Sequence, residues 1–117
     1  MIGKSETASA VQMMSGVVRK TLVVGDRMLL AQFSFEAGAV VPVHQHPHEQ
    51  VGYVISGRQR LTVGDEVHFI EGGDSYFIPG GVPHATEAIT DSVAVDTFCP
   101  PREDYIPADR EGPGAGL

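Results

Sequence analysis

The chain has 117 residues, the length of a single domain, and 42% of them are hydrophobic, as in ordinary globular proteins. Fifteen acidic and eight basic residues give a net charge of −7, which repels nucleic acid and requires a local cation for any anionic small substrate. No apolar run approaches membrane-spanning length, and the first ten residues lack the apolar core of a signal peptide. With one cysteine, Cys99, an intramolecular disulfide is excluded, so we expect a cytoplasmic protein without membrane or nucleic-acid partners.

Short β-prone runs separated by turn residues fill the chain from Val17 onward. The first two, residues 17–24 and 27–35, meet across Gly25 and Asp26, a combination typical of a tight hairpin. Turns recur at the spacing of an all-β sandwich or barrel, and no long helical pattern competes with them. The order of the runs favours a double-sheet jelly roll. The further runs are residues 40–46, 50–56, 59–63, 66–70, 75–79, 84–89 and 92–98.

The two ends of the chain differ in composition from this central part. Residues 1–14 are small and polar, which predicts a flexible N-terminal arm or a single helical turn. Residues 107–117 are rich in Gly and Pro, which predicts a flexible C-terminal tail. The β-barrel is therefore expected over residues 15–106.

Four polar side chains are spaced so that they can meet at one point inside this barrel. His44 and His46 stand two residues apart, and side chains at i and i+2 of a strand share a face. Gln50 follows the bend expected at Pro47, and His84 follows a turn rich in Gly and Pro. Three imidazoles and one amide supply the neutral donors that bind a divalent metal. We therefore predict a metal site formed by His44, His46, Gln50 and His84.

Other assignments remain open for this segment. Taken singly, most histidines are surface or hydrogen-bonded residues without a metal. His48 is expected in a loop at the barrel mouth and stays a minor candidate ligand, whereas His68 is expected on a solvated strand face. Glu49 would replace Gln50 as a ligand if the chain were shifted by one residue.

The two segments that carry these residues resemble the paired motifs of the cupin family. The first motif, G-x5-H-x-H-x3-E-x6-G, is matched from Gly38 to Gly57, except that Gln50 replaces Glu. The second, G-x5-P-x-G-x2-H-x3-N, is matched from Gly73 onward, except that Ala88 replaces Asn. The resemblance covers about residues 27–102 and implies a jelly-roll fold, dimers formed through exposed strands, and a bound metal.

The exchange of Glu for Gln at position 50 has a chemical consequence. An amide does not cancel any of the metal's charge, so the bound ion would be a stronger Lewis acid. The ligand types suit one divalent transition metal, Ni, Zn, Fe or Mn, without deciding among them.

A second group of candidates lies near the end of the last strand. Asp96 and Phe98 share a strand face in apolar surroundings, and Arg102 follows two prolines. From spacing alone, a strand-end Asp and a surface Arg are the favoured interpretation. The small pectin-degradation cupins, which linearise 4,5-unsaturated uronates, carry a similar Asp-x-Phe-x3-Arg segment and the same His-x-His-x3-Gln set. This resemblance implies that Asp96 and Arg102 are catalytic and that Phe98 and Arg102 bind a small anionic sugar. Cys99 is expected as a small buried residue near the pocket rim.

Three functions follow from these patterns. The first is an isomerase that opens the ring of an unsaturated monouronate from pectin or alginate and yields a linear ketouronate. The second is an iron- or copper-dependent dioxygenase of a small molecule, and the third is a non-catalytic module that binds a sugar or a metal.

Overall fold

Ten antiparallel strands and two single-turn 3₁₀ helices make up residues 1–107, the part of the chain that the computed structural model describes. This confirms the all-β prediction. The helices are η1 (Ser5–Thr7) and η2 (Glu103–Tyr105). The strands are β1 (Ala10–Met14), β2 (Val17–Val24), β3 (Leu29–Phe35), β4 (Val40–His44), β5 (Glu49–Ser56), β6 (Arg58–Val63), β7 (Glu66–Glu71), β8 (Ser75–Ile78), β9 (His84–Ala88) and β10 (Ser92–Cys99).

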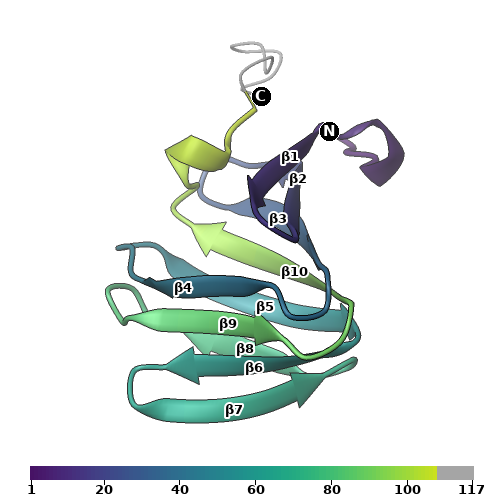
Figure 1. The fold of residues 1–117 in the computed structure, drawn as a ribbon. Helices are drawn as coiled ribbons and strands as arrows, with labels where there is room; N and C mark the ends of the chain where they lie inside the picture. The colour runs from purple at the N-terminus through teal and green to yellow at the C-terminus, as the bar shows by residue number, and fades with distance from the viewer. Residues whose placement is uncertain (108–117) are drawn as a thin grey trace.

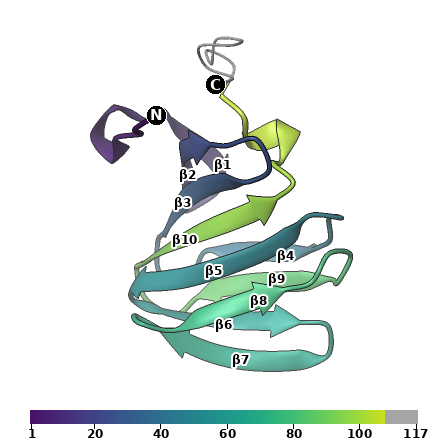
Figure 2. The same ribbon diagram turned by 180° about the vertical axis from the view of Figure 1, so that it is seen from behind.

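The strands form two sheets that face each other as a jelly roll (Figure 1). One sheet has the order β1-β2-β3-β10-β5-β8, and the other has the order β4-β9-β6-β7. Figure 2 shows β5 and β8 from behind, lying across from the second sheet. Because β10 pairs with both β3 and β5, the end of the chain holds the middle of the larger sheet together.

Alternation of buried and exposed residues decides which side chains enter the barrel. In β3 and β10, every second residue is buried, as expected for strands with one face on a core. At one end, Phe33, Phe98 and Tyr105 pack edge to face, with ring centroids 5.3 to 6.4 Å apart. At the other end, the core is formed by aliphatic side chains. These are Val54, Leu61, Ile70 and Ile78.

The predicted hairpin over the first two runs is confirmed. Strands β2 and β3 pair along their length, and the turn closes with a 2.7 Å hydrogen bond from Gly25 N–H to the Met28 carbonyl. The glycine that ends the first sequence motif is also explained. Gly57 has a φ of 82°, and a Cβ there would overlap the Asp91 carbonyl, so only glycine is accommodated.

The structure differs from the predicted N-terminal arm at residues 10–14. These residues form β1, which pairs with β2, and the side chains of Met13 and Met14 pack partly buried against the core. Backbone pairing and the burial of two methionines therefore order a segment whose composition predicted a flexible arm. Residues 1–9 hold only the single turn η1. Of the predicted C-terminal tail, residues 108–117 lie outside the described part.

The prediction of a buried Cys99 is wrong. Phe98 points into the core, and strand alternation turns the next side chain outward, so Cys99 is exposed. Among residues 1–107 there is no helix with the length and apolar character required to cross a bilayer.

Removing the N-terminal segment in two steps tests the role of β1. Deletion of residues 1–14 should lower the free energy of unfolding by about 2 kcal/mol, because it uncovers the inner apolar side chains next to Met13 and Met14. Deletion of residues 1–9 should have a smaller effect. Urea unfolding of the two truncated proteins checks this, and equal losses would show that β1 contributes nothing.

Candidate metal centre

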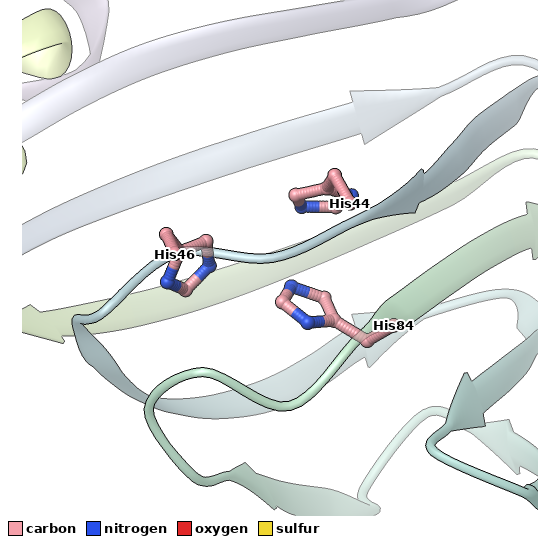
Figure 3. A group of neighbouring side chains, drawn as sticks. All are labelled: His44, His46 and His84. Atoms are coloured by element: carbon pink, nitrogen blue, oxygen red, sulfur yellow. The ribbon is translucent and has the colours of Figure 1, made fainter.

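Three histidines from two neighbouring strands and an adjoining loop converge (Figure 3). His44 ends β4, and His84 begins β9 directly opposite it in the antiparallel register. His46 lies two residues beyond β4, so it reaches the same point from the loop and not from the strand. The ring centroids lie 4.2 to 5.8 Å apart, and one nitrogen from each ring lies within 4.8 Å of the others. The predicted convergence of His44, His46 and His84 is confirmed.

Backbone carbonyls decide which nitrogen of each ring faces this centre. Each Nδ1 lies at hydrogen-bond distance from a carbonyl two residues away, so Nδ1 carries the proton and Nε2 presents a lone pair. This is the arrangement of metal-binding histidines. The contacts join His44 to Pro42 (2.9 Å), His46 to His48 (3.0 Å) and His84 to Val82 (2.8 Å).

The acceptor atoms that face this centre without a donor fit a bound cation. Nε2 of His84 is buried and has no hydrogen-bond partner among the described residues. Nε2 of His46 lies 3.2 Å from Oε1 of Gln50, so two lone-pair atoms face each other. The amide of Gln50 is held in this orientation because its Nε2 donates to Asp96 at 2.8 Å. A metal ion would satisfy all three acceptor atoms at once.

Burial favours the neutral form of His46 and His84, which is the form that binds metals. The pKa of His84 is lowered from 6.5 to about 4, mainly because the ring is removed from water. The pKa of His46 is lowered by burial and by the nearby guanidinium of Arg102. Neither ring therefore needs to lose a proton before a metal binds at neutral pH.

Asp96 is the buried charged group of the pocket. It is 3% exposed, and burial raises its pKa from 3.8 to about 6 against the opposing hydrogen bonds from Gln50 and Tyr76. Both bonds are 2.8 Å long. The carboxyl group therefore titrates near neutrality, where it can give or take a proton.

Arg102 and two aromatic rings close the same pocket. The guanidinium of Arg102 lies 4.1 Å from the ring centroid of Tyr105 and 5.4 Å from that of Phe98. Its Nε and Nη2 form a fork on the carboxylate of Asp104, at 3.3 and 3.0 Å. The contact with Asp104 shows that both nitrogens of this guanidinium can bind one carboxylate at the same time.

These groups surround one cavity of about 60 Å³. Its lining joins three of the four metal-binding candidates, His44, Gln50 and His84, to the second group of sequence candidates. The polar lining residues are His44, Gln50, Gln59, Tyr76, His84, Thr86, Asp96, Arg102 and Tyr105.

Comparison with known proteins identifies the family. The family model described as "Cupin domain" matches residues 31–99. The chain belongs to the cupin family. It is 29% identical over 93 residues to the pectin degradation protein KdgF of Dickeya dadantii, a match that covers 78% of this chain and 84% of that protein.

Solved structures of cupins have the same fold. The structure of KdgF from Halomonas sp. superposes with a TM-score of 0.84 at 27% identity, covering 89% of this cupin and 96% of that chain. An RmlC-like cupin from Shewanella frigidimarina superposes with a TM-score of 0.86 at 30% identity, covering 90% and 95%.

The structure also places the minor candidates of the sequence. Glu49 is exposed on the outer face of β5, whereas Gln50 is buried in the site, so the shifted register is excluded. His48 is half-buried with its ring 5.5 Å from that of His46, and it contributes its backbone carbonyl to the site. His68 is exposed beside Glu66, as expected.

Among the residues that sequence reasoning missed are Tyr76 and Tyr105, which line the pocket of this cupin, and Asp104, which binds Arg102. Tyr76 lies in β8 with the parity of the buried Ile78, which was a usable signal. A second signal was Gly52 in the middle of β5, because an interior strand glycine marks a close approach of other atoms. Tyr105 and Asp104 follow the last strand, and no periodicity predicts their positions.

Metal binding can be tested with one ligand variant and one matched control. His84→Ala should weaken binding of Ni²⁺ or Zn²⁺ by more than about 100-fold, because even changes outside the ligand shell cost 10- to 100-fold. His68→Ala, at an exposed position, should leave the affinity unchanged. Isothermal titration and elemental analysis check both variants. Equal affinities would place the metal elsewhere or show that none is bound.

The lowered pKa of His84 predicts how the stability of the metal-free protein depends on pH. Between about pH 4 and 6.5 the unfolded chain binds a proton on His84 that the folded chain does not. The free energy of unfolding should therefore fall by roughly 1–3 kcal/mol through His84 as the pH decreases across this window.

Urea unfolding with a chelator present, at several pH values, measures this slope in the wild type and in His84→Gln. Their difference isolates His84 from Asp96, whose raised pKa acts in the opposite direction. Parallel stability curves for the two proteins would contradict the prediction.

Proposed function

We propose that this cupin is a metal-dependent isomerase that converts a 4,5-unsaturated monouronate into a linear ketouronate. The observation that carries the proposal is one cavity whose lining joins metal-binding imidazoles to the second group of candidates. It is lined by His44, His84, Asp96, Phe98 and Arg102, and His46 completes the cluster of three imidazoles beside it. A Lewis-acid site, a carboxyl group with a pKa near 6, an aromatic wall and a guanidinium suit an anionic sugar better than a neutral or apolar molecule. The similarity to proteins named for pectin degradation supports the same substrate class.

Arg102 would bind the carboxylate of the substrate. Its fork is engaged by Asp104. The side chain of Asp104 is 61% exposed and that of Arg102 is 15% exposed, so water reaches the pair from the Asp104 side. A substrate carboxylate approaching from the cavity can therefore take the place of Asp104. Arg102 lines the same cavity as Asp96 and the metal-binding candidates, so it can hold the carboxylate of a uronate bound there.

The reaction is an isomerisation and needs no second substrate. The hydroxyl proton at C1 is removed, the bond between C1 and the ring oxygen breaks, and C1 becomes an aldehyde. The ring oxygen keeps the electron pair of that bond and stays on C5 as an enolate, and protonation at C4 then gives the C5 ketone. A bound divalent cation would supply a Lewis acid for the substrate oxygens. Asp96, with a pKa near the working pH, would take the first proton and return one to C4.

A homodimer is part of the proposal because the outer face of the larger sheet is apolar. Strand β5 exposes Val51, Tyr53 and Ile55 to about half of their full extent, and Phe77 of the edge strand β8 pairs with Val51. A contiguous apolar patch of this kind indicates a contact surface. A second copy suits it, because an uncharged patch beside a free strand edge can pair with itself despite the net charge of −7.

Activity is tested by following the loss of ultraviolet absorbance of the C4=C5 enol ether with metal-loaded protein. Asp96→Asn should reduce kcat by about 100-fold or more, the usual contribution of a general acid–base group. Arg102→Gln should mainly raise KM, because it removes the fork that binds the carboxylate.

Glu103→Gln is the matched control for a change of one charge, since Glu103 is exposed and directly follows Arg102 in the chain. It should behave as the wild type. A wild-type rate no faster than the spontaneous reaction would reject the isomerase. Oxygen uptake by the reduced iron or copper form would then favour a dioxygenase, and tight binding without turnover would favour a binding module.

The dimer is tested by Ile55→Glu, which places a charge in the apolar patch and should shift the protein toward monomer in sedimentation equilibrium. Val67→Glu, at an equally exposed position on β7 in the other sheet, should not change the assembly. A wild-type monomer at micromolar concentration would overturn this part of the proposal.

A further inference from the structure

Asp96, Gly52 and Tyr76 stand in one row across three strands of the larger sheet. Asp96 of β10 pairs with Gly52 of β5, and Gly52 pairs in turn with Tyr76 of β8. Paired residues project from the same face of a sheet, so Asp96 and Tyr76 flank the glycine on the inner face. Neighbouring strands are about 4.8 Å apart, so β10 and β8 are separated by two such spacings. The side chains of Asp96 and Tyr76 can meet because Gly52 on β5 has no side chain to separate them.

The contact across this gap is a hydrogen bond to one particular oxygen. The hydroxyl of Tyr76 donates to Oδ1 of Asp96 at 2.8 Å, and Nε2 of Gln50 donates to the same oxygen at 2.8 Å. No hydrogen bond to Oδ2 of Asp96 occurs from residues 1–107. Two donors on one oxygen fix the plane of the carboxyl group and leave its other oxygen available to the cavity that Asp96 lines.

Gly52 is required for this contact. A Cβ at position 52 would overlap the ring of Tyr76 on one side and Oδ1 of Asp96 on the other. Glycine in the interior of a strand lowers stability, so its presence calls for a local reason. Here the reason is the passage of the Tyr76 hydroxyl over the backbone of β5 to reach Asp96.

We propose that Tyr76 is a positioning residue, admitted by Gly52, which holds Asp96 so that its free oxygen faces the substrate. This inference rests on the proposed function, in which Asp96 moves the protons. Tyr76 does not touch the reacting atoms in this role. It acts through Asp96, and Gln50 provides the second point of attachment from the metal side of the site.

The competing explanation is that Tyr76 only fills the core. Its ring packs against the aliphatic cluster at the closed end of the barrel, next to Ile78 and Val54. A phenylalanine would fill this space equally well, because the two rings differ only by the hydroxyl. Tyr76→Phe therefore separates the two explanations without opening a cavity.

In the metal-loaded protein, Tyr76→Phe should lower kcat by about 10- to 100-fold, the cost of a carboxyl group displaced by about 1 Å. KM for the unsaturated uronate and the metal content should remain within twofold of the wild type, because Arg102 and the three histidines are untouched. Ser75→Ala is the control. It removes a hydroxyl from an exposed position on the same strand, β8, and should leave kcat and KM unchanged.

A readout independent of turnover comes from crystal structures of the wild type and Tyr76→Phe. The wild type should show Oδ1 of Asp96 bound by both donors, and the variant should show the carboxyl group rotated or in two orientations. Gly52→Ala should give an equal or larger kinetic defect, because the added Cβ meets both the ring of Tyr76 and Oδ1 of Asp96.

The outcomes separate the two proposals. If Asp96→Asn is inactive while Tyr76→Phe keeps kcat within twofold, the positioning role is wrong and the isomerase stands. If the wild type turns over no uronate, the isomerase is wrong, and the orientation of Asp96 in the two crystal structures decides whether Tyr76 holds it. An Asp96 carboxyl unchanged in Tyr76→Phe would overturn the inference in either case.

Discussion

The site depends on three short hydrogen bonds between histidine Nδ1 atoms and backbone carbonyls two residues away. Each bond selects one tautomer and turns the opposite nitrogen toward a common centre. Because the acceptors belong to the backbone, no additional side chain is needed to orient the ligands, and the strand ends of β4 and β9 set the geometry. The orphaned Nε2 of His84 and the facing acceptors of His46 and Gln50 follow from this choice.

The chemistry of the pocket comes from the placement of ionisable groups inside a barrel that otherwise buries hydrocarbon. Burial makes imidazoles poorer bases and carboxyl groups weaker acids, so His84 and Asp96 are moved in opposite directions by the same cause. Gln50 joins the two halves, since its oxygen faces His46 and its nitrogen donates to Asp96. One neutral amide thus links the metal centre to the proton-transfer group, a link that a glutamate in its place could not form with a charged Asp96.

Local patterns predicted much of this structure, and contacts between distant segments account for what they missed. Alternation in residues 92–98 correctly put Asp96 and Phe98 on one face, and two spaced motifs brought His44, His46 and His84 together. The hydrogen bond between Tyr76 and Asp96 depends on how β8, β5 and β10 pair. The spacing of residues within one strand does not reveal the register between three strands. The edge strand β1 was missed for a similar reason, because its order comes from pairing with β2 and not from its own composition.

The wall of the pocket mouth consists of residues that follow the last strand. The ring of Tyr105 contacts the guanidiniums of both Arg19 and Arg102, and its backbone carbonyl accepts a 2.6 Å hydrogen bond from Thr21. Residues 100–107 do not pair with a strand of either sheet. Exchanges at the exposed positions Glu103 and Asp104 can reshape the entrance while the strand pairing and the buried Tyr105 stay intact, so new ligand preferences can evolve in this scaffold with little effect on folding.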